Sequence, residues 1–224
     1  MFIMLILTMA VDGFAQDQDW ANLARFKEEN AKLGLPAAGE KRIVFMGNSI
    51  TQYWQEFSPG FFKDKPYINR GISGQTTPQM LVRFRADVVA LKPAVVVILA
   101  GINDIAGNTG PSTLEMIMDN LTSMAEIAAA NGIKIVMSSV LPAYDFPWRP
   151  GLKPAEKVFT LNGMIKKYAN QHGFVYLDYF SAMTDLRKGM NSAYSDDGVH
   201  PNKAGYHVME PLTEAAIKLA LAAK

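Results

Sequence analysis

KPAVVVILAGIND, residues 92–104, joins a proline to seven apolar residues, Ala94 to Ala100, and then to a glycine turn. An apolar run of this length that is rich in β-branched residues predicts a strand buried on both faces. Such strands occur in parallel sheets that helices cover on each side. The stretch therefore predicts an α/β fold, with Gly101-Ile102-Asn103-Asp104 in the loop beyond a central strand.

The rest of the chain repeats this alternation of a short apolar strand with a longer helical pattern. One helix has Thr77 as its expected N-cap, Pro78 in its first position and apolar residues at helical spacing as far as Leu91. The further strands are predicted at 42–46, 67–70, 133–140 and 174–177, and the helices at 17–34, 77–91, 112–131, 158–173 and 202–221. Such alternation predicts βαβ units in a single domain, residues 16–224, with helices on both faces of a parallel sheet.

Composition excludes several classes of protein. The 224 residues are 49% hydrophobic and 19% charged, which is typical of a chain with a sizeable core and not of a disordered one. The net charge is +1 and no long basic run is present, so nothing indicates a nucleic-acid partner. There is no cysteine, which excludes disulfides, thiolate catalysis and cysteine-ligated zinc.

The first 15 residues, MFIMLILTMAVDGFA, indicate a signal peptide. Their apolar run has the length of an export signal, and Gly13-Phe14-Ala15 is a suitable cleavage site. The run is too short to span a bilayer comfortably, and it lacks the usual basic residue before the apolar core. We expect an exported, periplasmic or cell-envelope protein without stable membrane insertion; if residues 1–15 are an ordinary strand, the protein is cytoplasmic.

Four unrelated segments are expected to meet at one edge of the sheet. Ser49, Gly71, Asn103 and the loop after Val140 each follow a predicted strand. In an open parallel sheet, ligands bind beyond the carboxyl ends of the strands. Ser49 lies on a strand-to-helix turn, where a hydroxyl can be exposed and its backbone N–H lies at the positive end of a helix. A serine in such a turn is also a common cap.

A serine nucleophile needs a base, and the chain has three histidines. His172 lies at a helix end and His207 inside the last helix, where capping and packing explain them. His200 lies on a loop, three residues after Asp197, whose carboxylate can fix the tautomer of the imidazole. Asp196 is a competing partner, but its side chain should point elsewhere.

The oxyanion of an acyl-transfer reaction needs preorganised donors. The candidates are the backbone N–H groups of Ser49 and Gly71 and the side-chain amide of Asn103. The alternative of a metal site at Asp196, Asp197 and His200 lacks a further ligand at diagnostic spacing. No phosphate loop or dinucleotide fingerprint is present.

Taken together, these segments resemble the four sequence blocks of the SGNH hydrolases, also called GDSL esterases and lipases. The blocks are Gly47-Asn48-Ser49-Ile50, Gly71, Gly101-Ile102-Asn103-Asp104 and Asp197-Gly198-Val199-His200, in family order across about residues 41–206. The resemblance implies a three-layer, flavodoxin-like fold and ester hydrolysis without metal or cofactor. It implies Ser49 as nucleophile, His200 as base, Asp197 as its orienting group, and Ser49, Gly71 and Asn103 as oxyanion donors. Asn48 replaces the aspartate that usually precedes the serine.

The substrate is predicted from aromatic residues near the site. Tyr53 and Trp54 follow Ser49 closely, and Tyr144 and Trp148 lie in the loop after the strand at 133–140. Aromatic faces can stack on sugar rings, and the resemblance extends to exported SGNH proteins that remove acetyl groups from carbohydrates. We therefore expect a small-molecule or oligosaccharide ester as the partner, with the oligomeric state undecided. The alternatives are a lysophospholipase or thioesterase for longer acyl chains, and a non-catalytic glycan-binding module.

Overall fold

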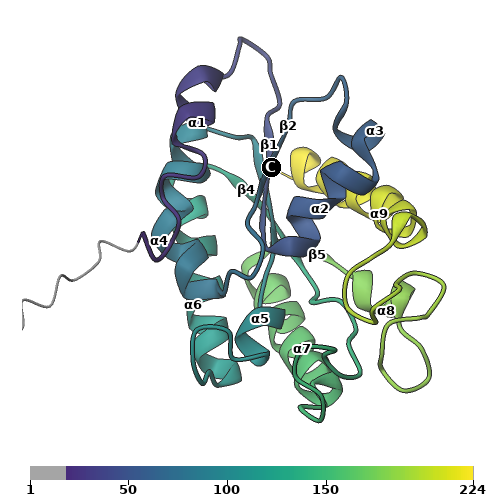
Figure 1. The fold of residues 1–224 in the computed structure, drawn as a ribbon. Helices are drawn as coiled ribbons and strands as arrows, with labels where there is room; N and C mark the ends of the chain where they lie inside the picture. Colours follow the sequence, from purple (N-terminus) through teal and green to yellow (C-terminus); the bar gives the residue numbers. More distant parts are fainter. Residues whose placement is uncertain (1–18, 224) are drawn as a thin grey trace, which may run out of the picture.

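Five short parallel strands form the centre of the protein, in the spatial order β2-β1-β3-β4-β5 (Figure 1). The strands are β1 (Ile43–Gly47), β2 (Tyr67–Gly71), β3 (Val95–Leu99), β4 (Lys134–Ser138) and β5 (Val175–Leu177). The computed structural model describes residues 19–223, so the predicted signal peptide at residues 1–15 lies outside the described part of the chain. The parallel sheet expected from the sequence is confirmed, with each strand within a few residues of its predicted position.

Helices cover both faces of the sheet (Figure 1). On one face α6 packs against α4 and α7, and on the other α9 packs against β3, β4, β5 and α2. The helices are α1 (Lys27–Leu33), α2 (Ser49–Phe57), α3 (Pro59–Phe62), α4 (Thr77–Asp87), α5 (Ile102–Ile105), α6 (Leu114–Ala130), α7 (Ala155–His172), α8 (Tyr179–Met183) and α9 (Lys203–Ala222), with a 3₁₀ turn at Val89–Leu91. The three-layer α/β fold is therefore confirmed. Within residues 19–223, no helix combines the length and apolar character that a membrane span requires.

The central strands carry the core. All five residues of β3 are buried, and all five residues of β1 are buried beside them. Phe45 of β1 pairs with Asn69 of β2 on one side and with Val97 of β3 on the other. Helices cover both faces of the sheet at these two strands, which explains why the sequences of β1 and β3 are almost continuously hydrophobic.

The helix predicted at 17–34 is wrong in its first half. Residues 20–26 form turns, and α1 begins only at Lys27. The carboxylate of Asp19 accepts from the backbone N–H groups of Leu23 (2.7 Å) and Ala24 (2.8 Å), and Asn22 has a positive φ of 54°. An aspartate that binds nearby N–H groups offers the backbone an alternative to the helix.

Thr76, and not the predicted Thr77, caps α4. The side chain of Thr76 and the side chain of Gln79 form a reciprocal capping box at the helix start. Thr77 instead donates from its N–H (3.0 Å) and hydroxyl (2.6 Å) to the buried carboxylate of Asp104. This contact fixes the start of α4 against the loop after β3, which is the edge of the sheet where the site lies.

Candidate active site

Ser49 is the first residue of α2, directly beyond the end of β1. The side chain of Asn48 caps this helix by accepting from the N–H of Ile50 (3.0 Å). A Cβ on Gly47 would overlap the side chain of Thr51, so only glycine permits so sharp a turn from strand to helix here. At its other side, α2 is held to α9 because the Tyr206 hydroxyl donates to the carbonyl of Ile50 (2.8 Å).

The structure brings Ser49, His200 and Asp197 into one hydrogen-bonded row. The Oγ of Ser49 lies 2.9 Å from Nε2 of His200, and Nδ1 of His200 lies 2.7 Å from Oδ2 of Asp197. The His200 side chain is 28% exposed and that of Asp197 40%, whereas Ser49 is only 5% exposed, so the row reaches the surface at its His200–Asp197 end. This is the geometry in which an imidazole can take a proton from a serine while a carboxylate orients the ring.

The Asp197 carboxylate also organises the loop that carries His200. Its Oδ1 accepts from the N–H groups of Val199 and His200, both at 2.8 Å, and from the Ser195 hydroxyl at 3.1 Å. Burial alone raises the pKa of Asp197, but hydrogen bonds from the ring and N–H of His200 and from the N–H of Val199 outweigh it and hold the pKa below its ordinary value. Asp197 therefore remains ionised beside the imidazole. Ser195 carries no motif in the sequence and was not predicted.

The competing residues lie elsewhere, as expected. The ring of His172 is exposed and lies 4.3 Å from the ring of Tyr168, and His207 is an exposed residue of α9. The carboxylate of Asp196 accepts from the side chain of Asn202 (3.2 Å) at the start of α9.

The predicted oxyanion donors differ in their availability. The Ser49 N–H has no acceptor among the described residues. The Asn103 side-chain amide donates to the carbonyl of Gln75 (3.0 Å), which leaves its second hydrogen free. The Gly71 N–H already donates to Oδ1 of Asn69 (2.9 Å), which argues against the role predicted for it. A Cβ on Gly71 would overlap the backbone of Thr51 and Gln52, so this glycine serves the close packing of α2.

Gly74, three residues later, is a further candidate donor that was not predicted from the sequence. It is exposed, has a φ of +77°, and its N–H has no acceptor among residues 19–223. Its carbonyl accepts from Asn108 (3.1 Å), and the next residue, Gln75, receives the Asn103 amide. The sequence feature that could have indicated Gly74 is the Gly71-Ile72-Ser73-Gly74 turn. In it Gly71 allows the close packing of α2, and Gly74 keeps an N–H without an acceptor among residues 19–223.

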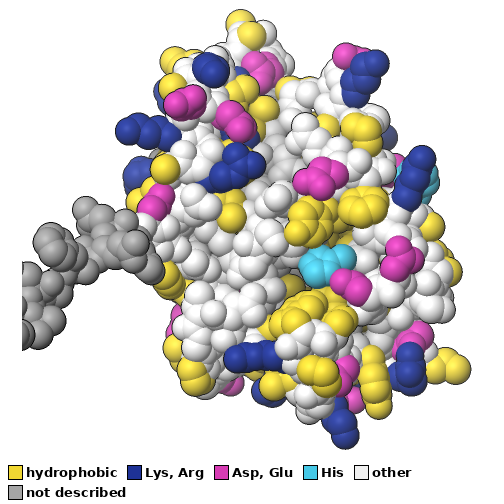
Figure 2. All heavy atoms as spheres, viewed as in Figure 1, with side chains coloured by type: hydrophobic (Ala, Val, Ile, Leu, Met, Phe, Trp, Pro, Cys, Tyr) yellow, Lys and Arg dark blue, Asp and Glu magenta, His cyan; other side chains and the backbone are white. Residues whose placement is uncertain are grey.

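Two of the four aromatic residues predicted to bind substrate lie beside the row. The ring of Tyr53 lies 5.9 Å from that of His200, and the ring of Trp148 lies 6.0 Å from it on another side. Trp148 is 45% exposed. An adjoining cavity of about 240 Å³ is bounded by Tyr53, Phe57 and the loop around His200. Figure 2 shows hydrophobic side chains gathered around a histidine on this face of the molecule.

The prediction for Trp54 is wrong. Trp54 is 1% exposed and stacks between Phe61 (4.8 Å) and Tyr206 (5.6 Å) in the core. Tyr144 is exposed, but the guanidinium of Arg187 lies over its ring, 4.9 Å from the ring centre. Successive residues of a helix point about 100° apart, so Tyr53 and Trp54 cannot both face the site.

The loop that presents Trp148 is held in place at several points. The Asp145 carboxylate accepts from the N–H groups of Phe146 (3.0 Å) and Gly151 (2.7 Å). Phe146 is fully buried and stacks on Trp148 at 5.1 Å, and Arg149 donates to the carbonyl of Ala106. The exposed Trp148 ring is therefore presented by an ordered loop.

A buried arginine joins the segments beneath the site. Arg83 of α4 donates to Gln75 Oε1 (2.6 Å), to Asp87 (3.0 Å) and to the carbonyls of Gly47 (3.1 Å) and Arg70 (2.8 Å). Its side chain is fully buried. Gly47 precedes the turn at Ser49, and the carbonyl of Gln75 accepts from the Asn103 amide. One guanidinium therefore holds both segments in position.

Comparison with known proteins agrees with this geometry. A family model described as the GDSL-like lipase/acylhydrolase family matches residues 45–208. The crystal structure of a GDSL-like lipase from Bacteroides thetaiotaomicron is 48% identical, covers 90% of this chain and 100% of its own, and superposes with a TM-score of 0.88. Esterase TesA from Pseudomonas aeruginosa is 28% identical over 80% of this chain and 85% of its own length.

A further relative is larger. The acetylxylan esterase of Xylanibacter ruminicola is 29% identical over 82% of this chain, which spans 45% of that protein. The matched residues 45–208 contain the turn at Ser49, the loop after β3 and the loop around His200. The chain therefore belongs to the GDSL-like lipase/acylhydrolase family, the SGNH hydrolases that its sequence resembles, and is an esterase of that family.

Proposed function

We propose that this esterase removes O-acetyl groups from carbohydrates, with Ser49, His200 and Asp197 as its catalytic triad. The observation that carries the triad is the unbroken row of hydrogen bonds, 2.9 Å from Ser49 to His200 and 2.7 Å from His200 to Asp197. The same three groups, in this order of contacts, activate serine in unrelated hydrolases.

The reaction follows from the positions of these atoms. The Oγ of Ser49 attacks the acetyl carbonyl while Nε2 of His200 takes the hydroxyl proton, and Asp197 stabilises the resulting imidazolium. The sugar oxygen leaves with that proton, and the acetyl group remains on Ser49. Water then attacks the acetyl-serine with His200 again as base, which releases acetate and restores the hydroxyl.

The negative oxygen of the tetrahedral intermediate needs donors on the side away from His200. We assign the N–H of Ser49, the free amide hydrogen of Asn103 and the N–H of Gly74 to this task. Each is without another acceptor among the described residues, and each belongs to a segment that the sheet edge brings together. Donors fixed before the reaction stabilise the developing charge without reorganisation.

The surroundings of His200 support an acetylated sugar as the substrate. A small cavity of about 240 Å³ lies beside His200, and the exposed Trp148 ring borders the row. Aromatic faces of this kind suit sugar rings. The acetylxylan esterase that this chain resembles supports the same substrate class.

The second candidate is a lysophospholipase or thioesterase for longer acyl chains, which the likeness to esterase TesA and the lipase relatives favours. A glycan-binding module without catalysis is disfavoured by the intact row of contacts. Hydrolysis of p-nitrophenyl acetate and p-nitrophenyl octanoate separates the three. Acetate alone supports our proposal, a preference for octanoate overturns it in favour of the second candidate, and hydrolysis of neither points to the binding module.

Export to the periplasm or cell envelope is a further part of the proposal, because the apolar run at residues 1–15 has the length of a signal sequence. Fractionation of cells that express the full chain with a C-terminal tag tests it. Recovery of the uncleaved chain from the cytoplasm would overturn this part alone.

A further inference from the structure

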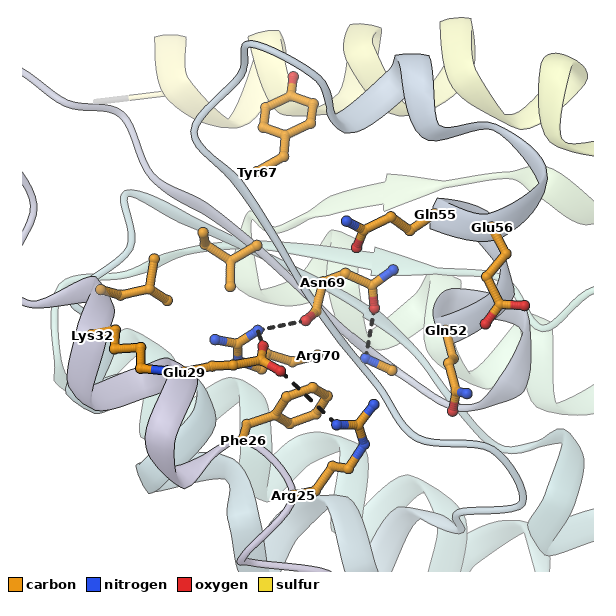
Figure 3. A pocket seen from close by; sticks show the side chains of 13 residues that line it. Arg25, Phe26, Glu29, Lys32, Gln52, Gln55, Glu56, Tyr67, Asn69 and Arg70 are labelled. Carbon is orange, nitrogen blue, oxygen red and sulfur yellow. Dashed lines mark hydrogen bonds and ion pairs between the residues drawn. The ribbon is translucent and has the colours of Figure 1, made fainter.

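A second and larger hollow lies on the other side of α2 from the His200 cavity. It has a volume of about 600 Å³ and runs along the outer strand β2, between α2 on one side and α1 with the two residues before it on the other (Figure 3). We call it the β2 groove. Figure 3 shows side chains of α2 on one wall and side chains of residues 25–32 on the other. The polar and charged lining residues include Gln52, Gln55, Glu56, Arg25, Glu29 and Arg70.

The β2 groove adjoins the catalytic row because one helix serves both. Ser49 begins α2, and Gln52, Gln55 and Glu56 follow it by three to seven positions. At a rise of about 1.5 Å per residue, these side chains start roughly 5–10 Å along the helix axis from the nucleophile. Gln52 also accepts from the N–H of Ser73 (2.8 Å), and the Ser73 hydroxyl lies 3.3 Å from that of Tyr53, which borders His200.

The floor of the groove is fixed by internal hydrogen bonds. Arg70 donates to Oδ1 of Asn30 (2.9 and 2.8 Å) and to the carbonyl of Asn69 (2.7 Å). The Asn69 amide donates to the carbonyl of Thr51 (2.6 Å). These bonds hold the side chains of Asn69 and Arg70 in place, so the floor of the groove is preformed.

The α2 wall, in contrast, keeps polar groups that no described residue satisfies. The side chains of Gln55 and Glu56 make no hydrogen bond within residues 19–223, and the Gln52 side chain uses only its oxygen. An amide group can donate to and accept from hydroxyls, whereas a carboxylate accepts from them. The wall therefore offers several contacts to a ligand rich in hydroxyl groups.

Charge in the groove is nearly balanced. The guanidinium groups of Arg70 and Arg25 lie 3.5 Å and 3.9 Å from Glu29, and the remaining charged lining groups, Lys32 and Glu56, have opposite signs. A strongly anionic or cationic ligand would meet both signs, whereas an uncharged one meets polar groups without net repulsion. The volume lies within the range of about 300–1,000 Å³ found for ligand sites.

We propose that the β2 groove binds the uncharged chain of an oligosaccharide whose acetylated ring lies at Ser49. The inference rests on the proposed function, because it names where the rest of the substrate goes. Binding in the β2 groove makes the enzyme selective for acetylated chains over acetylated monosaccharides, since only a chain reaches from Ser49 to the groove.

The test compares small and long substrates in the full chain and its variants. Gln55→Trp fills the groove, Gln55→Ala removes contacts, and Gln171→Ala changes an exposed glutamine of α7 as the matched control. For acetylated xylo-oligosaccharides we expect KM to rise roughly 3- to 10-fold in Gln55→Ala, as loss of one or two hydrogen bonds does, and more in Gln55→Trp. KM for p-nitrophenyl acetate and acetylated xylose stays unchanged, and Gln171→Ala behaves as the parent.

Equal KM values for long substrates in the parent and both Gln55 variants, with hydrolysis of small esters intact, overturn the groove and leave the proposed function standing. Absence of acetyl-ester hydrolysis in the parent chain overturns the proposed function instead. Calorimetric binding of unacetylated xylo-, gluco- and manno-oligosaccharides then tests the groove without catalysis. Binding of one of them that weakens in Gln55→Trp supports it, and binding of none, or only of an acidic oligogalacturonate, overturns it.

Discussion

Ser49 and His200 are 151 positions apart in the sequence, yet Oγ of the serine lies 2.9 Å from Nε2 of the histidine. The contact forms because β1 ends directly below Ser49, while the loop before α9 brings His200 back to the same edge of the sheet. In the proposed mechanism neither residue is reactive alone, because the Ser49 hydroxyl needs His200 as its base and His200 needs Asp197 to orient its ring. The following predictions measure how far this arrangement controls activity and stability.

Ser49→Ala should reduce kcat on p-nitrophenyl acetate by about 10⁴- to 10⁶-fold, as loss of a triad nucleophile does elsewhere. The fold should survive, because only the Oγ is removed. Ser123→Ala, on α6, is the matched control and should retain full activity. Activity of Ser49→Ala near the parent level would remove Ser49 from the mechanism.

His200→Ala should cost more than Asp197→Asn, because the first removes the base and the second only disturbs its orientation. Losses of about 10⁶-fold and 10⁴-fold in kcat are the expected scale. Asp196→Asn, next to Asp197 but bonded to Asn202, should change kcat by only a few-fold. If Asp196→Asn proves as damaging as Asp197→Asn, the carboxylate has been assigned to the wrong residue.

The lowered pKa of Asp197 predicts a dependence of stability on pH. Because its pKa in the folded protein lies below the unfolded value of about 3.9, ionised Asp197 stabilises the fold above that pH. The contribution is lost as the pH falls through the folded pKa. Urea unfolding should therefore show Asp197→Asn less stable than the parent at neutral pH, with the difference shrinking below about pH 4. A difference that grows in acid would reverse the assigned direction.

Arg83→Met should lower the free energy of unfolding by about 3–5 kcal/mol, because it leaves the buried Asp87 carboxylate unpaired. It should also reduce ester hydrolysis, since Gly47 and Gln75 lose their common donor. The control is Arg85→Met, which alters an exposed arginine on the same helix. Chemical denaturation of both variants decides the matter, and equal effects would show that the buried contacts contribute little.

Trp148→Ala should raise KM for acetylated sugars several-fold and leave p-nitrophenyl acetate almost unaffected. The ring is held beside His200 by its ordered loop, so its loss removes a surface on which a sugar ring can stack. Trp20→Ala removes an equally exposed tryptophan, 50% against 45%, from the N-terminal turns and serves as control. An unchanged KM for acetylated sugars would limit Trp148 to packing on Phe146.

Most of the fold could be predicted because the strands are short apolar runs between glycines and prolines. The run from Val95 to Leu99 is buried along its whole length, as its residues require. The helix predicted from residue 17 failed because the decisive event is a pair of bonds to the Asp19 carboxylate, which the spacing of apolar residues does not report.

The contacting row was predictable because Ser49, Asp197 and His200 have specific neighbours in the sequence. The residues around it were less so. Trp54 is four positions after the buried Ile50, which places both on the core side of α2, whereas Tyr53 points toward His200. The difference between Gly71 and Gly74 depends on which N–H is already bonded, and a sequence does not show that.

The hydrogen bond from the Tyr206 hydroxyl to the carbonyl of Ile50 has a consequence for the synthesis and folding of the protein. It joins α9 to α2, the helix that begins at Ser49, and the loop that enters α9 holds His200, the proposed base. A nascent chain that has completed all five strands, as far as Leu177, still lacks His200 and α9. If these residues catalyse the reaction as proposed, ester hydrolysis begins only after α9 has been made and has folded into place.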